Sequence, residues 1–499
     1  MHEFVTTIAL IGIVIIVASL LSGALERSGL PVVAVFLALG AMLGPLGLGL
    51  VDVGFASPSL RVLATLGLAL LLFSDAVTLE TTQLRARGAL LLRILGPGTL
   101  VPAALMALAA WWLLDLHVAA ALIIGAALAS TDPVLLRTVL RSRALPEVPR
   151  VALRIETGMN DAVLLPVVIL SMLALHAHAA PGEAVTRGDV GRSVLGLFVL
   201  GPALGALVGW AGIRILAFVR TRLGVRRDYE SLYAIGLAFS AFATAEAVGG
   251  SGFVAAFVAG LLVAAQDVEL CDCFLEYGEA TSEMLLLLTF VALGGSLIWT
   301  GLADLDPRTL LFAGIALVAR TAILIPVLAR SGVHARDRQL IALFGPRGLS
   351  SLLLVLLPVF AGVPGAERLF AITCTVVLAS VVLHGGGIAL YLRRHARRVA
   401  APVAHAPDVV PHGNGAGVGD PLGAPDGPDG VPERITLDEV RVLQSLGEAV
   451  VMVDARTERN YRADPREIVG SVRMNADDPV RDATALRLSQ RATLVVYCA

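Results

Sequence analysis

Two polar stretches stand in the most apolar part of the sequence, "ALASTDPVLLR" at 127–137 and "IETGMNDAVLLP" at 155–166. Their polar side chains include those of Thr131, Asp132, Glu156, Asn160 and Asp161. An ionisable side chain in the middle of a bilayer is costly, so it indicates a functional site. Hydroxyl, carboxylate and freed backbone carbonyl oxygens are the groups that bind small cations at the membrane midplane. These residues are therefore candidates for a cation site.

The expected depth of these residues supports one shared site. The apolar run at 118–140 enters from the outer side and places Thr131 and Asp132 roughly 20 Å deep, at a helical rise of about 1.5 Å per residue. The run at 150–175 enters from the opposite side and places Asp161 roughly 17 Å deep. Two antiparallel helices thus bring their acids to about the same level.

Pro133 indicates a break in the first of these helices. Proline lacks a backbone N–H and disfavours helical geometry at the residue before it, which is Asp132. A break frees backbone carbonyls, and Thr131 adds a hydroxyl, so the pattern favours a cation site. The alternative is that Asp132 caps the second half-helix. The two roles are compatible.

The second stretch places its polar groups on two adjacent helix faces. Thr157 and Asp161 are four residues apart and share one face. Glu156 and Asn160 share the other. Thr157 and Asp161 can therefore face an ion while Glu156 faces the partner that a buried carboxylate needs. Arg320 lies at a similar depth in a later apolar run, and we predict a buried Glu156–Arg320 ion pair.

A second interruption occurs in "LFGPRGLSS", where Gly345, Pro346 and Gly348 divide the apolar run at 338–361. Two interrupted helices seven spans apart suggest an inverted repeat of spans one to six on spans eight to thirteen. We expect Arg347 to neutralise the C-terminal dipoles of half-helices where the interrupted helices cross.

Composition sets the class of the protein. The chain has 499 residues, of which 57% are hydrophobic and 16% charged, with a mean hydropathy of +0.82. A soluble domain usually has about a quarter charged residues. About thirteen apolar runs of about 20 residues recur between residues 4 and 392, and each is long enough to cross a bilayer as a helix. We predict an all-α polytopic membrane protein in a lipid bilayer, and the net charge of −2 gives no sign of nucleic-acid binding.

Loop charges predict the orientation. Arginines cluster in alternate loops, and the intervening loops carry little positive charge. The positive-inside rule then places the N-terminus outside and the C-terminus in the cytoplasm of a plasma (inner) membrane.

The composition changes after Arg398. The membrane domain is expected at 1–398, and residues 399–434 are a Pro- and Gly-rich stretch that reads as a flexible linker. Residues 435–499 have a soluble α/β pattern, in which "AVVMVDAR" and "ATLVVYCA" are typical of buried parallel strands.

The motifs "STDPV", "ETGMNDAV", "GSGFVAAFVAGL" and "FGPRGLSS", in this order across about 390 residues, resemble the NhaP-type sodium/proton antiporters. These are the electroneutral branch of the monovalent cation–proton antiporters, and the paired Asn–Asp is typical of that branch. The resemblance implies thirteen helices with the fifth and twelfth broken and crossing, a dimerisation domain, a core domain and a homodimer.

The resemblance also implies roles for single residues. Asp161 would bind the ion or the proton, and Thr131, Asp132 (through its backbone) and Thr157 would be further ion ligands. Asn160 would contact the Thr–Asp segment, and Glu156 with Arg320 would match the family's structural ion pair. In the run at 60–79 the family often has Glu directly after Phe; here Ser74 and Asp75 follow, so they are tentative ligands.

The C-terminal stretch resembles the start of a rhodanese-like domain, through "VVMVDARTERNYRADPREIVGSVRMNADD" and "VVYCA". Cys498 would be the active-site thiolate. In such a domain, backbone N–H groups from the residues after the cysteine surround the thiolate, and this sequence has one residue after Cys498. We therefore expect no sulfurtransferase activity from this chain. The expected protein is a transporter rather than an enzyme. An intact module would bind a cytoplasmic regulatory partner.

The expected function is electroneutral exchange of one monovalent cation for one proton. Na+ is the first choice, with K+ or Li+ possible, and no cofactor is needed beyond the transported ions. Cation and proton would compete for Asp161, and the core domain would cross the membrane in an elevator-like movement. The alternatives are an ion-binding receptor or sensor that signals through the rhodanese-like tail, or another ion carrier. A carrier of anions should place helix N-termini and arginines at the centre.

Overall fold

The computed structural model describes most of the chain up to residue 399 and short segments beyond it. The described residues are 12–17, 20, 32–50, 53–79, 88–142, 145–179, 187–223, 225–266, 278–303, 305–399, 440, 443, 449–455, 468, 470–474, 483, 486, 488 and 492–497. They belong to two compact units, Met1–Pro402 and Val403–Ala499. The first unit is helical and the second contains a small parallel sheet.

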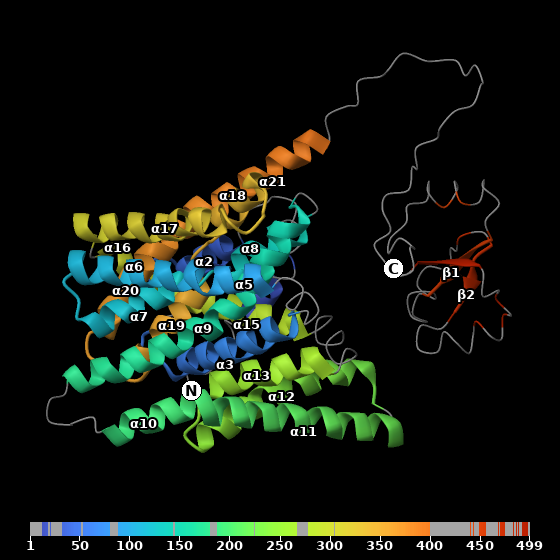
Figure 1. The fold of residues 1–499 in the computed structure, drawn as a ribbon, viewed down its shortest axis with the longest axis horizontal. Coiled ribbons are helices and arrows are strands. Elements are labelled where there is room, and N and C mark those ends of the chain that lie inside the picture. The colour runs from blue at the N-terminus through green and yellow to red at the C-terminus, as the bar shows by residue number, and fades with distance from the viewer. Residues whose placement is uncertain are drawn as a thin grey trace, which may run out of the picture. The chain divides into compact units, whose positions relative to one another are not determined.

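The helices of the first unit run along one another in a bundle (Figure 1). They are α2 (Val32–Leu43), α3 (Pro58–Val77), α5 (Gly88–Leu95), α6 (Pro97–Leu113), α7 (Val118–Ala129), α8 (Pro133–Arg141), α9 (Glu147–Ala179), α10 (Arg187–Leu195), η1 (Gly196–Leu200), α11 (Gly201–Arg222), α12 (Arg227–Ala247), α13 (Gly252–Gln266), α15 (Glu279–Gly295), η3 (Leu297–Trp299), α16 (Thr300–Ala303), α17 (Pro307–Leu328), α18 (Ala335–Leu343), α19 (Leu349–Phe360), α20 (Ala366–Ser380), η4 (Val381–Gly385) and α21 (Gly386–Val399).

Seven helical segments within the described part of the chain are long and apolar enough to cross a membrane. They are Pro58–Val77, Gly88–Leu113, Val118–Leu140, Glu147–His178, Gly188–Arg222, Pro307–Leu328 and Ala366–Leu392. Four shorter apolar helices accompany them. The predicted class of polytopic helical membrane protein is confirmed. The count of thirteen stays a prediction, because most of the first predicted span lies outside the described residues.

Several helices begin where proline follows a residue that can cap. Proline is pre-organised for the first helical position and lacks the N–H that would have no partner there. Asp306 precedes Pro307 and its Oδ1 accepts the N–H of Thr309 at 2.6 Å, so α17 begins at this point. Hydrogen bonding from this N–H holds the pKa of the Asp306 carboxyl below its ordinary value. Asp132 and Pro133 begin α8 in the same way.

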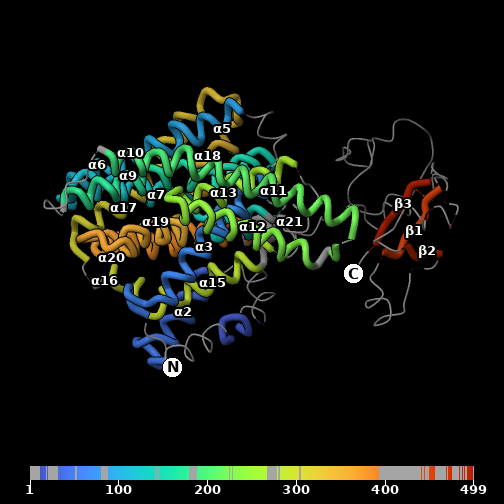
Figure 2. The backbone as a smooth tube through the Cα atoms, turned by 90° about the horizontal axis from the view of Figure 1, so that it is seen from below, coloured from blue at the N-terminus to red at the C-terminus, as the bar shows by residue number. Residues whose placement is uncertain are grey.

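Two groups of helices can be distinguished by their packing. In the first, which we call the broken-helix group, α6 packs against α7 and α17, the helices α7, α8 and α18 pack against α9, and α19 packs against α20. In the second, the flanking group, α13 packs against α3, α11 and α12, and α15 packs against α2 and α3. Figure 1 shows α17, α6 and α7 above, with α3, α13 and α11 below, and Figure 2 shows α15 beside α2 and α3. The groups meet where α3 lies against α9.

Both predicted interruptions are present in the broken-helix group. Helix α7 ends at Ala129 and α8 begins at Pro133, with Ser130 and Asp132 extended between them. Helix α18 ends at Leu343 and α19 begins at Leu349. The backbone N–H of Asp132 donates to the carbonyl of Pro346 at 2.9 Å, so the two breaks lie directly against each other.

In the described segments of the second unit, three parallel strands form a sheet in the order β2-β1-β3. They are β1 (Val450–Asp454), β2 (Val472–Arg473) and β3 (Thr493–Tyr497), and β1 and β3 correspond to the two predicted strands. Cys498 and the predicted linker from residue 400 to residue 434 lie outside the described residues. The rhodanese-like identity of this unit stays a prediction.

Close packing of α6 on α7 requires a glycine. A Cβ added at Gly125 of α7 would lie 2.7 Å from the Cβ of Ala107 and closer still to the backbone carbonyl of Ala103, both on α6. A Cβ added at Gly314 of α17 would meet no atom within 4 Å. Gly125 therefore sets the distance between the helices that carry the first break.

We predict opposite effects for the same added methyl group at these two glycines. Gly125→Ala should destabilise the protein by about 1–3 kcal/mol, because overpacking forces the helices apart. Gly314→Ala should be neutral or stabilising by up to about 1 kcal/mol, because alanine favours a helix. Thermal unfolding of detergent-purified protein measures both. Equal unfolding temperatures for the two variants would contradict the packing argument.

Candidate cation site

The carboxylate of Asp132 caps two helices at once. Its Oδ1 accepts the backbone N–H groups of Val134 at 2.7 Å and Leu135 at 3.1 Å, at the start of α8. Its Oδ2 accepts the N–H of Leu349, at the start of α19. The side chain is 1% exposed. The Asp132 side chain therefore has the capping role that the sequence left open as an alternative. It caps α19 of the second break as well as α8.

The side chain of Arg347 binds the C-terminal end of α7. Its Nη1 donates to the carbonyls of Ala129 at 2.8 Å and Ser130 at 2.9 Å, where α7 ends. A cation at a helix C-terminus offsets the negative end of the helix dipole. The structure thus places Arg347 where the sequence predicted it: the residue belongs to the break between α18 and α19, and its guanidinium reaches the first break at the end of α7. Together, Asp132 and Arg347 supply a negative charge to two helix N-termini and a positive charge to a helix C-terminus.

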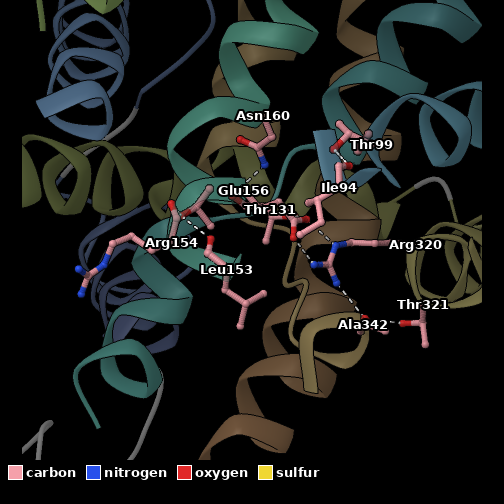
Figure 3. A network of polar contacts seen from close by, with 12 residues as sticks. Ile94, Thr99, Thr131, Leu153, Arg154, Glu156, Asn160, Arg320, Thr321 and Ala342 are labelled. Atoms are coloured by element: carbon pink, nitrogen blue, oxygen red, sulfur yellow. Dashed lines mark hydrogen bonds and ion pairs between the residues drawn. The ribbon is translucent and has the colours of Figure 1, made fainter. Parts of the chain in front are cut away.

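Asp161 lies beside the first break with one oxygen free of protein donors. Its Oδ1 accepts a hydrogen bond from the hydroxyl of Ser130. Its Oδ2 is buried and has no hydrogen-bond partner among the described residues, and the same holds for Oδ1 of Asn160. The amide of Asn160 points to the carbonyl of Thr131, 3.5 Å away (Figure 3). Unsatisfied oxygens in a buried place are rare and mark a site with a ligand or a function.

Thr157 lies on the same helix as Asp161, one turn earlier. Its hydroxyl is within 3.0 Å of the carbonyls of Leu153 and Arg154, to which it donates. The hydroxyl proton is thus directed to the helix itself, and the oxygen keeps a lone pair for an ion. The structure does not join Thr157 to Asp161 by a hydrogen bond among the contacts described.

The predicted buried ion pair between Glu156 and Arg320 is present. Nε of Arg320 lies 2.7 Å from Oε1 of Glu156, and Nη2 lies 2.6 Å from Oε2 (Figure 3). Nη1 of Arg320 donates to the carbonyl of Ala342 at 2.8 Å, near the end of α18. The hydroxyl of Thr131 donates to Oε1 of Glu156 at 3.2 Å. This network joins α9, α17, α18 and the first break.

The tentative ligands on α3 lie at the boundary between the two helix groups. Ser74 and Asp75 are both buried. A Cβ at Gly158 of α9 would lie 3.2 Å from the backbone carbonyl of Asp75, so α3 approaches α9 one turn before Asp161. Their role as ligands stays a prediction.

Sequence reasoning missed two serines of the site. Ser130 donates to Asp161, and Ser350 is near enough to contribute to the electrostatic environment of the Asp161 carboxylate. Both belong to the quoted motifs, "STDPV" and "FGPRGLSS". The available signal was their position in these motifs, Ser130 in the first interruption and Ser350 in the first turn of α19 directly after the second interruption.

The fold and the site define a polytopic helical membrane protein in which two broken helices meet beside a buried carboxylate. Residues 13–394 match the family described as "Sodium/hydrogen exchanger, transmembrane". The chain belongs to this family.

Relatives and a solved structure agree with this assignment. The K(+)/H(+) antiporter NhaP of Alkalimonas amylolytica is 28% identical over 388 residues, which cover 77% of this chain and 65% of that protein. The Na(+)/H(+) antiporter NhaG of Bacillus atrophaeus is 27% identical over 348 residues, 67% of this chain and 63% of that protein. This chain thus spans slightly less than two thirds of either relative. The sodium proton antiporter MjNhaP1 from Methanocaldococcus jannaschii has a similar fold, with a TM-score of 0.62, 20% identity and coverage of 77% of this chain and 100% of that chain.

Removing one member of the buried pair should cost far more than removing both. Glu156→Gln leaves the Arg320 charge unpaired and should destabilise the protein by about 3–5 kcal/mol. The double change Glu156→Gln with Arg320→Met removes both charges and should recover most of that loss, because apolar replacements of buried pairs are often near neutral. Thermal unfolding in detergent measures both. A double variant as unstable as Glu156→Gln alone would contradict this account.

Proposed function

We propose that this protein exchanges one monovalent cation for one proton across the membrane, with Asp161 as the group for which they compete. The observation that carries the proposal is Oδ2 of Asp161, a buried carboxylate oxygen without a protein partner among the described residues, beside the crossing of two broken helices. Family membership and the names of the relatives support the same reading.

The neighbouring oxygens supply a small-cation site. Among the described residues, the carbonyl of Thr131 has only the long contact with Asn160, at 3.5 Å, so it is available to an ion. The hydroxyl oxygen of Thr157 and the backbone of Asp132 complete the proposed ligand set. The Asp132 side chain is occupied by helix N–H groups and serves the site by holding the break open.

Charge balance makes the exchange electroneutral. Either a proton or a monovalent cation neutralises Asp161, and the loaded site then has the same charge in both directions. Glu156 is paired with Arg320 and takes no part in the proposed exchange. One proton therefore moves per cation and no net charge crosses.

We further propose that the broken-helix group moves against the flanking group in an elevator-like manner when Asp161 is neutralised. An ion pair between Arg137 of α8 and Glu283 of α15 joins the two groups. Its side chains are 20% and 28% exposed, so it can open to water at little cost.

The remaining parts of the proposal follow from the family and the sequence. We propose a homodimer in the plasma membrane, with the N-terminus outside, the C-terminus in the cytoplasm and a regulatory partner at the C-terminal unit. The relatives' names include both K+ and Na+. Na+ is the first cation to test, followed by K+ and Li+, since the oxygen ligands suit all three.

The experiment is the dissipation of a pH gradient in inside-out vesicles with an acid interior. Na+, K+ or Li+ added outside should restore the interior pH in the wild type, and Asp161→Asn should reduce this to background because asparagine cannot exchange a proton. Asp115→Asn is the matched control. It lies exposed at φ 52°, a conformation that asparagine tolerates, and should transport like the wild type.

Failure of every cation to restore the pH would contradict antiport, and transport by Asp161→Asn at the wild-type rate would contradict the role of this residue. An imposed membrane potential should leave the rate unchanged. A receptor or another kind of carrier would show no coupling between cation entry and proton exit.

A further inference from the structure

A hydrogen-bonded chain leads from His384 to the proposed cation site. His384 lies in η4, the π-helical turn between α20 and α21, and its Nδ1 is 3.1 Å from the hydroxyl oxygen of Ser380. That oxygen accepts the backbone N–H of Arg347 at 2.7 Å. The guanidinium of Arg347 then holds the carbonyl of Ser130, whose hydroxyl donates to Asp161. The proposed exchange cycle makes no use of His384 or Ser380.

The backbone N–H of Arg347 can only donate, so the hydroxyl oxygen of Ser380 accepts from it. The hydroxyl of Ser380 keeps its proton and a second lone pair, so it pairs with Nδ1 of His384 in either tautomer of the imidazole. Ser380 thus joins the peptide of Arg347 to the ring of His384.

The Arg347 peptide needs such a partner because it lies outside any helix. It belongs to the break between α18 and α19, where no helical carbonyl is available to its N–H. Arg347 is 1% exposed and Ser380 is fully buried, so bulk water does not reach this peptide. A π-helical turn directly after Ser380 agrees with a functional position, since such turns are frequent at functional sites.

We propose that Ser380 and His384 are positioning residues, which fix the peptide of Arg347 and thereby direct its guanidinium to the end of α7 beside Ser130 and Asp161. This rests on the proposed function in one respect only, that cation binding occurs at Asp161. The charged groups that face His384 are Arg347, from the break, and Arg320, from α17. Arg320 is paired with Glu156, whereas the backbone of Arg347 is linked to His384 through the hydroxyl of Ser380.

The test compares three variants in the vesicle assay. Ser380→Ala and His384→Leu remove the two members of the chain and should raise the half-saturating cation concentration about threefold to tenfold, the effect of one lost hydrogen bond, with a smaller change in maximal rate. His384→Asn keeps an acceptor oxygen near the position of Nδ1 and should restore the wild-type value. Rescue by asparagine separates the hydrogen bond from the bulk of the ring.

Thr373→Val is the matched control. Thr373 is also buried on α20, and its hydroxyl donates to the carbonyl of Leu369 in the same helix at 2.8 Å. Loss of that hydroxyl should leave cation saturation unchanged. An equal effect in Thr373→Val, or no rescue by His384→Asn, would overturn the proposal by showing that any disturbance of this helix has the same result.

Hydrogen–deuterium exchange of the segment 344–349 tests the contact without transport. Ser380→Ala and His384→Leu should speed exchange of the Arg347 amide, and Thr373→Val should not. Wild-type exchange together with wild-type saturation in the first two variants would overturn the proposal. If the wild type transported no cation, the proposed function would fail, and amide exchange would still decide whether these residues hold the Arg347 peptide.

Discussion

The two helix N-termini that share the carboxylate of Asp132 are the constraint on which the rest of the site depends. A break in a membrane helix exposes backbone groups that lipid cannot satisfy. Asp132 accepts N–H groups from α8 and α19, and Arg347 donates to the carbonyls at the end of α7. The pair turns two interrupted helices into one rigid crossing. Ser130 and Thr131 are held beside Asp161 as a consequence.

Three buried carboxylates near the crossing differ in their hydrogen-bond partners. Asp132 is occupied by backbone donors, and Glu156 by Arg320 and Thr131. Both carboxylates therefore already have donors in the protein. Among the described residues, Asp161 accepts a hydrogen bond from Ser130 and keeps an oxygen without a partner, so it is the carboxylate best suited to change ligand. Exchange needs a carboxylate that can bind either a cation or a proton, and Asp161 is suited to this role because its neighbours Asp132 and Glu156 are already occupied by protein groups.

Local chemistry in the sequence was enough to predict several features of the site. Pro133 marks the first break, and the depth of Arg320 gave its pairing with Glu156. Other contacts across the bundle could not be predicted from the sequence, because they depend on how helices distant in sequence are placed. The second helix capped by Asp132 and the link from Ser380 to Arg347 are of this kind. The number of spans could be read only approximately from hydropathy, since short apolar helices such as α2 and α19 fall below the usual spanning length.

The central claim is competition between a cation and a proton for one carboxylate, and proton release on cation binding tests it most directly. The purified full chain in weakly buffered detergent solution is titrated with Na+, K+ or Li+ while the pH is recorded. The account predicts about one proton released per cation bound in the wild type, and neither binding nor release in Asp161→Asn. Cation binding without proton release, or equal release by Asp161→Asn, would contradict it.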